Sequence, residues 1–328
     1  MPASDPARAI AARLGTRLGA RSRMTSYLGL AIVAAAVATV LPGQGIVGAF
    51  AAAAQPPTRT VATINAPQLK EISGCAVSSQ TPGGGRIVWV HNDSGDGPNV
   101  YAVDGRTGRL RATFAVTGAR AEDWEDMALS KGQLYMGDIG DNSANRASIV
   151  VYRVAEPVIP RKSVVAVRPT SASVALQLRY PDGSHNAETL IVHPTTGDLY
   201  IVTKTEDGHS GVYALRGAAT AEAGSYALEK VADLTIAGEG LIYPNEITAG
   251  DISPSGDRIV LRTYQYLYVY RPSPGSSFDS AWTSVATQVN APFLLQAEAL
   301  CFTPDGRYVL TTQEGLPAPL VEIDLRKV

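Results

Sequence analysis

Several familiar signatures are missing from this 328-residue sequence, and each absence narrows the chemistry available to it. Only two cysteines are present, and no Cys-x-x-Cys pair, which excludes a thioredoxin-like redox motif or a zinc ribbon. The sequence has no P-loop, no Gly-x-Gly-x-x-Gly after a strand, no His-Glu-x-x-His and no Gly-x-Ser-x-Gly elbow. The formal net charge of −2 argues against a broad nucleic-acid-binding surface. What remains is a globular composition, 45% hydrophobic and 18% charged.

The first 54 residues have the pattern of a secretory signal peptide. Five arginines precede an apolar run over residues 27–41, Pro42 ends that run, and four alanines finish at Ala54. A basic segment, a short apolar segment and a small-residue exit define such a peptide, so we expect cleavage near Ala54. The alternative is an uncleaved anchor, for which the apolar run is short. We therefore predict a secreted protein with no stable membrane span after cleavage and a single domain over residues 55–328.

Residues 55–328 repeat one pattern five times. Each copy has a short apolar strand, a turn and a second strand that ends in polar residues, as in WEDMALS followed by QLYMGDIGDN. Successive copies are separated by 52, 63, 61 and 49 residues, and two more strands fit into each interval. Four strands per unit is typical of a β-propeller blade, so we expect an all-β, five-bladed β-propeller. The last copy is one strand short, and the strand over Thr58–Ile64 is expected to complete it and close the ring. A β-sandwich has a similar strand density but does not explain the in-phase repeat.

The first strand of a propeller blade lines the central channel, so equivalent positions in the five copies should converge at one channel mouth. These positions are Ser73, Glu125, Glu188, Ala249 and Glu298. Three carboxylates on a narrow axis repel one another unless they bind protons or a cation. Oxygen ligands, with a hydroxyl and a backbone carbonyl completing the set, favour Ca²⁺ over Zn²⁺. The alternative is a solvated channel whose glutamates pair with arginines or accept backbone N–H groups.

Polar residues also follow the second strand of each copy, and blade geometry puts them around the same mouth. For a catalytic site, His91 or Asp93 is the expected general base, with Asp138 beside them. Lys204 and Arg262 are the residue types that bind a phosphate. The other expected ligand-binding residues are Asn92, Asp141, Asn142 and Glu314. Ordinary loop polarity explains any one of these residues on its own.

The two cysteines fall in the first strands of the first and last copies, which become neighbours when the ring closes. A disulfide between Cys75 and Cys301 would lock that closure and add roughly 2–4 kcal/mol of stability. Their registers differ by one residue, so two buried free thiols are the alternative.

The motifs ISG, HNDSGDG, WED, GDIGDN, AE and AGDISP resemble a group of secreted bacterial propeller proteins with no settled function, over nearly all of residues 66–328. A more distant resemblance is to the calcium-dependent apyrases, five-bladed propellers with a central Ca²⁺. That family surrounds its ion with a serine, three glutamates and a backbone carbonyl, which implies as ligands Ser73, Glu125, Glu188, Glu298 and the Ala249 region. The sequence departs from the family at Ala249, where a serine is usual, and at Asn92, where an acid is usual.

The leading functional prediction is a secreted, calcium-centred binding or scaffold module. It is expected to be a monomer that presents its polar face to an extracellular small molecule or protein, and to bind no nucleic acid. One alternative is calcium-dependent hydrolysis of phosphoesters or nucleotides at the same face. A second alternative is glycoside hydrolysis, which needs two metal-free carboxyl groups roughly 5–9.5 Å apart.

Overall fold

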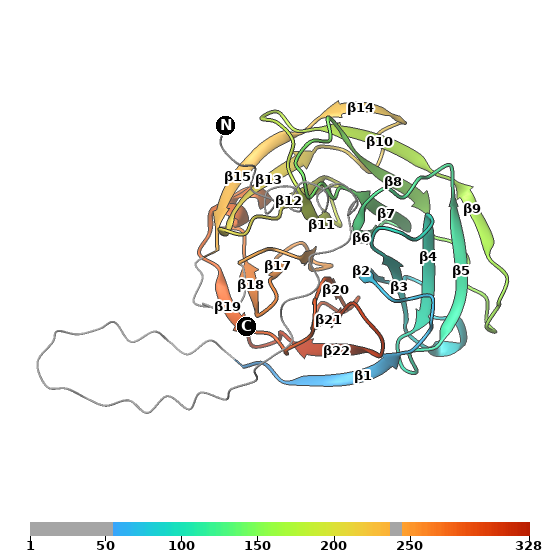
Figure 1. Cartoon of the computed structure of the whole chain (residues 1–328). Helices are drawn as coiled ribbons and strands as arrows, with labels where there is room; N and C mark the ends of the chain where they lie inside the picture. The colour runs from blue at the N-terminus through green and yellow to red at the C-terminus, as the bar shows by residue number, and fades with distance from the viewer. Residues whose placement is uncertain (1–54, 237–244) are drawn as a thin grey trace, which may run out of the picture. The chain divides into compact units, whose positions relative to one another are not determined.

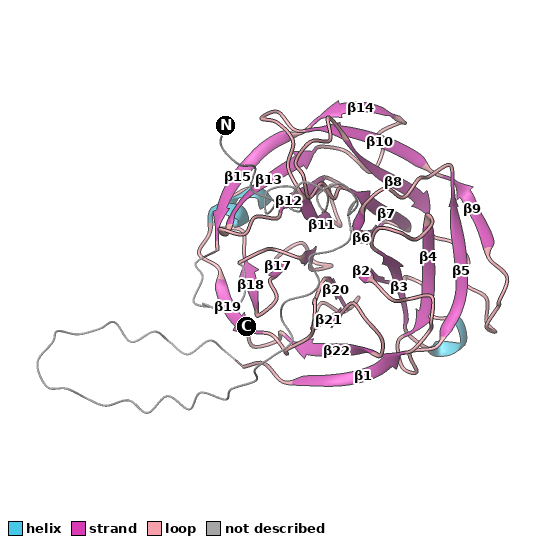
Figure 2. Ribbon diagram, viewed as in Figure 1, coloured by secondary structure: helices cyan, strands magenta, loops and turns pink. Residues whose placement is uncertain are grey.

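A computed structural model describes residues 55–236 and 245–328, all within one compact unit. These residues form five antiparallel-based sheets arranged in a ring (Figure 1). The helices among them are two short 3₁₀ segments, Pro82–Gly84 and Phe278–Thr283, and the rest is strand and loop (Figure 2). The predicted all-β, five-bladed propeller is confirmed. The predicted signal peptide, residues 1–54, lies outside the described residues.

Each blade contains four consecutive strands in antiparallel order, numbered from the channel outwards. Blade 1 consists of β2 (Ile72–Val77), β3 (Ile87–Asn92), β4 (Asn99–Asp104) and β5 (Leu110–Thr117), and blade 2 of β6 (Trp124–Ser130), β7 (Gln133–Asp138), β8 (Ile149–Ala155) and β10 (Val174–Arg179). Blade 3 consists of β11 (Ala187–Val192), β12 (Leu199–Thr203), β13 (His209–Leu215) and β15 (Glu229–Thr235), and blade 4 of β16 (Ala249–Ile252), β17 (Ile259–Arg262), β18 (Tyr266–Tyr270) and β19 (Thr287–Asn290). Blade 5 consists of β20 (Ala299–Phe302), β21 (Tyr308–Thr312), β22 (Ala318–Asp324) and β1 (Thr58–Ile64).

The N-terminal strand closes the ring, as the sequence predicts. Strand β1 pairs antiparallel with β22, with Ile64 opposite Ala318 and Thr58 opposite Ile323. The innermost strands then contact one another in a closed circuit, β2 with β6, β6 with β11, β11 with β16, β16 with β20 and β20 with β2. Closure satisfies the strand edges that an open array would expose.

Two further strands on the outside of the ring were not predicted. Strand β9 (Arg168–Ala172) leaves blade 2 and pairs in parallel with β5 of blade 1, and β14 (Gly224–Ala227) leaves blade 3 and pairs in parallel with β10 of blade 2 (Figure 1). Each therefore extends the preceding blade to five strands and covers its outer edge. Their sequences are mostly exposed and polar, so they lack the apolar alternation by which strands are recognised.

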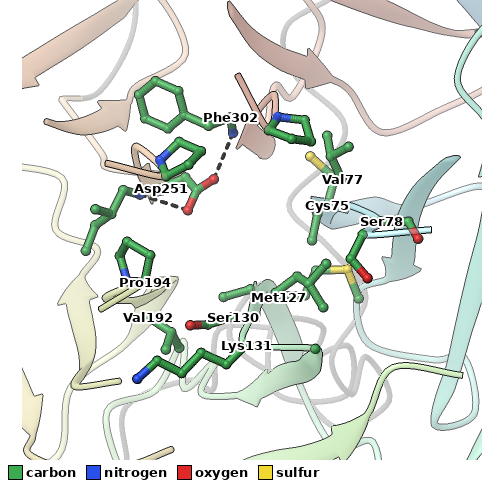
Figure 3. A pocket seen from close by; sticks show the side chains of 18 residues that line it. Cys75, Val77, Ser78, Met127, Ser130, Lys131, Val192, Pro194, Asp251 and Phe302 are labelled. Atoms are coloured by element: carbon green, nitrogen blue, oxygen red, sulfur yellow. Dashed lines mark hydrogen bonds between the residues drawn. The ribbon is translucent and has the colours of Figure 1, made fainter. Parts of the chain in front are cut away.

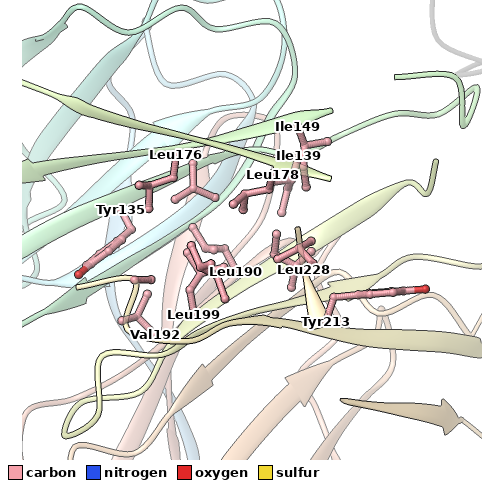
Figure 4. Packing of buried hydrophobic residues seen from close by; sticks show 14 of the residues in the cluster. Tyr135, Ile139, Ile149, Leu176, Leu178, Leu190, Val192, Leu199, Tyr213 and Leu228 are labelled. Carbon is pink, nitrogen blue, oxygen red and sulfur yellow. The ribbon is translucent and has the colours of Figure 1, made fainter. Parts of the chain in front are cut away.

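The hydrophobic core is divided among the interfaces between neighbouring blades. Between blades 2 and 3, Tyr135 and Leu176 face Leu190 and Leu199, with Leu228 beside them (Figure 4). Because each blade is covered on both faces, inner strands such as β3 and β11 are buried along their whole length. That burial explains why they read as continuous apolar runs.

The turns between the first and second strands use glycine where the backbone requires it. Gly197, Gly256 and Gly306 have φ angles of 76°, 71° and 66° in blades 3, 4 and 5. This left-handed conformation is open to glycine at little cost, so the repeated turns predicted from these residues are explained. A search of the residues that the structure describes finds no helix with the length and apolar character needed to cross a membrane.

We expect the Ile64→Ala variant to lose about 2–5 kcal/mol of unfolding free energy, because this β1 side chain is fully buried in the cluster between blades 5 and 1. The neighbouring Thr63 is exposed, so Thr63→Ala should change the value by less than about 0.5 kcal/mol. Denaturant unfolding of both variants measures the difference. Equal losses would contradict the role of β1 in closing the ring.

Candidate functional site

A repeated backbone irregularity directs three of the predicted side chains toward the channel mouth. The pairing of each inner strand with its neighbour skips one residue, and the skipped residues are Ser73 in β2, Glu125 in β6 and Glu188 in β11. A β-bulge of this kind turns the extra side chain away from the regular alternation of the strand. The same device therefore places equivalent residues of three successive blades at the start of their inner strands.

Carboxyl groups from several blades form one electrostatically coupled network at this mouth. Glu125, Glu188 and Glu298 are its buried members, at 3%, 6% and 6% exposed. Each of the three raises the pKa of at least one other member through its charge. The described members of this carboxylate mouth are Glu71, Asp93, Asp123, Glu125, Glu188, Glu246, Glu298 and Glu314.

The pKa values of these groups are raised, chiefly because burial penalises a charged carboxylate. Burial and then the charge of Glu188 raise the pKa of Glu125 well above its usual range. Burial and then Glu314 do the same for the pKa of Glu298. Burial raises the pKa of Glu188 to about 8, and that of Glu314 to about 7. The mouth therefore holds protons near neutral pH unless a cation replaces them.

Lys204 is the lysine that lies inside this network. Its ammonium group donates a hydrogen bond to Glu188 and lies 3.8 Å from a carboxylate oxygen of Glu246. It also lies 3.4 Å from the Tyr264 hydroxyl, which in turn donates to Glu298 over 3.2 Å. Burial alone would lower the pKa of Lys204, but the charge of Glu188 and other acids outweighs that effect and raises it. One permanent positive charge thus offsets part of the negative charge.

The tightest group of carboxylates differs from the predicted set of metal ligands. Oxygens of Asp93, Asp123 and Glu125 all lie within 4.8 Å of one another. Oxygens on one Ca²⁺, each at about 2.3–2.6 Å from the ion, would have this spacing. Asp123 was missed by the sequence analysis, although it precedes β6 in the WED motif and so lies two residues before Glu125. Asp93 was predicted as a general base and here lies among potential ligands.

The other predicted metal ligands have partners within the protein. The Ser73 hydroxyl donates a hydrogen bond to the backbone carbonyl of Glu125. Ala249 is fully buried and pairs with Arg262 in the β16–β17 ladder. Glu188 and Glu298 belong to the carboxylate mouth, where they accept the bonds from Lys204 and Tyr264. The second oxygen of Glu188 is buried and has no hydrogen-bond partner among the described residues.

His91 lies inside the protein rather than on the polar face. Its ring is fully buried, its Nδ1 is 2.9 Å from the Asn92 carbonyl, and its edge contacts Trp124. Burial lowers the pKa of His91, so the neutral imidazole is favoured. A Cβ at Gly74 would lie 2.4 Å from His91 Nε2, so glycine is needed there for the ring to fit.

Asp138 and its neighbours stabilise the loops around the mouth. Asp138 accepts the backbone N–H groups of Glu122 and Asp123 and forms an ion pair with Arg146 at 2.9 Å. Further hydrogen bonds hold the other predicted loop residues, from Asp141 to the Arg146 backbone N–H, from Asn186 to Asn142, and from Asn92 to Gln68 and Asp96. These side chains therefore position Asp123 and Asp93 beside Glu125.

Arg262 does not join Lys204 at the surface. The residue is 0% exposed, its Nη2 donates to the Pro292 carbonyl over 3.3 Å, and burial lowers its pKa to about 9. Its Nε and Nη1 have no hydrogen-bond partners among the described residues. The predicted phosphate clamp of Lys204 and Arg262 would require the guanidinium to leave this buried position.

Comparison with known proteins adds little beyond the fold. No protein-family description and no curated protein matches the chain. Among solved structures, the chain is similar to one described as the crystal structure of RRP9 WD40 repeats, at 12% sequence identity and a TM-score of 0.43. The alignment covers 82% of this chain and all of that one. At this level the likeness carries no inference about function, and the resemblance to apyrases stays a prediction.

We expect the stability of the metal-free protein to fall as the pH rises from about 5 to about 8. In the folded chain the pKa of Glu314 is about 7 and that of Glu188 about 8, whereas an unfolded glutamate titrates at about 4.3. The folded state thus holds protons that the unfolded state releases, so this contribution is present below the unfolded pKa and lost as the pH rises through the folded one.

Thermal unfolding followed by circular dichroism across this pH range tests the effect. Glu314→Gln should flatten the pH dependence because it removes one of the raised groups. Glu222→Gln, a change at an exposed site in blade 3, should leave it as in the wild type. A slope that Glu314→Gln does not alter would show that the network does not control stability.

Proposed function

We propose that this protein is a secreted binding module that holds Ca²⁺ at the carboxylate mouth and presents the surrounding polar face to an extracellular ligand. The observation that carries the proposal is the approach of Asp93, Asp123 and Glu125 to within 4.8 Å of one another, beside further buried glutamates. Export, the chemical identity of the ion and ligand binding are all parts of the proposal.

Charge balance favours a cation at this position. Eight carboxyl groups of the described chain interact here, while Lys204 contributes one positive charge from within and Arg146 acts on Asp123 from the side. Each ionised carboxylate makes the next one harder to ionise, which is the cause of the raised pKa values after burial itself. A divalent cation would remove that penalty at once, whereas protons alone would neutralise the groups only at lower pH.

The donor atoms favour calcium over the other common metals. The clustered ligand atoms are all carboxylate oxygens, which suit hard cations, whereas zinc and copper sites usually contain histidine or cysteine. The free oxygen of Glu188 and the carboxylate of Glu298 lie in the same network and offer further oxygens. The flexible, oxygen-rich coordination of Ca²⁺ fits contributions from loops and strands of different blades.

We expect protein freed of divalent ions by EDTA to bind Ca²⁺ and to melt at a higher temperature with Ca²⁺ than without it, because a ligand that binds only the folded state stabilises it. Isothermal titration calorimetry and thermal unfolding measure the two effects. Glu125→Gln removes the charge at the centre of the cluster and should weaken binding at least about tenfold.

Glu222→Gln is the matched control, since it removes a carboxylate of the same kind from an exposed position outside the carboxylate mouth. It should keep the affinity of the wild type. The proposal is overturned when Ca²⁺ produces neither binding heat nor a shift in melting temperature, or when both glutamine variants lose affinity equally.

A second candidate function is calcium-dependent hydrolysis of phosphoesters or nucleotides at the same mouth. The observation in its favour is the pairing of roles there, because burial raises the pKa of Asp93 and the charge of Lys204 acts on that same carboxylate. A carboxylate of this kind can take a proton from water, and Lys204 can neutralise a phosphate. The burial of Arg262 weighs against a two-cation phosphate clamp. Glycoside hydrolysis stays a prediction.

Release of phosphate from nucleoside diphosphates and sugar phosphates, with and without Ca²⁺, distinguishes binding from hydrolysis. If Asp93 is the base, Asp93→Asn should abolish release, since an amide keeps an oxygen for the ion but cannot accept the proton. Calorimetry of the same variant shows whether Ca²⁺ binding survives. Activity that persists in Asp93→Asn would remove Asp93 as the base, and no release on any substrate would leave the binding function.

A further inference from the structure

The two cysteines meet at the joint where the ring closes. Cys75 in β2 of blade 1 and Cys301 in β20 of blade 5 are both free thiols, 1% exposed, with their sulfur atoms 2.9 Å apart. An S–S bond is about 2.05 Å long, so a shift of under about 1 Å would join them. Both side chains belong to the apolar cluster that also contains Ile64 of the closing strand β1.

The bulge at Ser73 explains why the side chains meet although their sequence registers differ by one residue. Cys75 lies three residues after Ile72, which pairs with the last residue of β3, while Cys301 lies two residues after Ala299, which pairs with the last residue of β21. Because the bulge adds one unpaired residue to β2, both cysteines fall two pairs from the strand end. The offset that favoured divergent side chains in the sequence is therefore removed.

A cavity of about 250 Å³ leads to one of the two thiols but does not include the other. Its lining comes from all five blades and includes Val77, Met127, Val192, Ile252 and Phe302, together with Cys75 (Figure 3). Several of these residues end their inner strands, whereas the carboxylate mouth lies where those strands begin. The cavity thus opens the opposite end of the channel, and Cys301 is not among its lining residues.

We propose that Cys75 and Cys301 are a redox pair that small disulfides oxidise through this cavity, which joins blades 1 and 5 covalently. The Cys75 thiolate attacks one sulfur of a disulfide R–S–S–R, forms a mixed disulfide and releases one thiolate RS⁻. The Cys301 thiolate then attacks the Cys75 sulfur and releases the second RS⁻. The two cysteines lose two protons and two electrons, and the small disulfide is reduced to two thiols.

Two features set the rate and the consequence of this exchange. Burial, and then the hydrogen bond with Cys301, raise the pKa of the Cys75 thiol, so the reaction is slow near neutral pH and accelerates as the pH rises. The bond would link residues 226 positions apart, and a cross-link over a long loop restricts the unfolded chain strongly. Oxidation therefore adds a covalent closure to the hydrogen-bonded pairing of β1 with β22.

The test incubates the reduced full-length folded protein with bis(2-hydroxyethyl) disulfide and follows intact mass. The wild type should lose two hydrogen atoms, keep no thiol that an alkylating reagent can modify after denaturation, and melt at a higher temperature than its reduced form. Cys301→Ser should accumulate one mercaptoethanol adduct at Cys75. Cys75→Ser should react far more slowly, because Cys301 does not line the cavity.

Three results would each overturn the proposal. The first is a wild type that keeps two free thiols after incubation up to pH 9, a pH chosen as roughly the range where thiols ionise. The second is a Cys75→Ser variant that forms its adduct as fast as Cys301→Ser. The third is an oxidised wild type that melts at or below the temperature of the reduced protein, which needs no variant and so does not depend on either variant folding.

Discussion

The pairing of β1 with β22 is the contact on which the rest of the molecule depends. It joins the two ends of the described chain in one blade, and only a closed ring lets β20 contact β2 and brings blade 5 beside blade 1. The carboxylate mouth contains residues from both sides of that joint, with Asp93 after blade 1 and Glu314 after the second strand of blade 5. Without closure these groups would have no reason to interact, because they are separated by most of the chain.

Closure also has an electrostatic cost, and the structure shows how it is limited. Convergence of five blades places Glu125, Glu188 and Glu298 in a buried position where each opposes the ionisation of the others. Lys204 and Tyr264 reduce the cost by bonding to two of them, and proton uptake or a cation must offset the rest. The stability of the apolar interfaces between the blades allows this concentration of charge, in the way that functional sites are often strained locally.

The fold could be predicted from the sequence because the repeat carries it, while the details of the site could not. Five in-phase strand pairs and the leftover strand Thr58–Ile64 were enough to predict the blades and their closure. The strands β9 and β14 escaped because their exposed, polar residues owe their conformation to the edge of another blade. Asp123 escaped because a residue just before a strand shows no periodicity, and the burial of Arg262 because its partners come from a distant loop.

The bulge at Ser73 connects the two ends of the channel, since one inserted residue serves both. At the start of β2 it turns the Ser73 hydroxyl toward Glu125, whose carbonyl it contacts. Farther along the strand it shifts Cys75 into register with Cys301. A strand without the bulge would move one of these residues to the wrong face, because side chains alternate with a period of two. The geometry that builds the carboxylate mouth is therefore the same geometry that places the two thiols together at the seam.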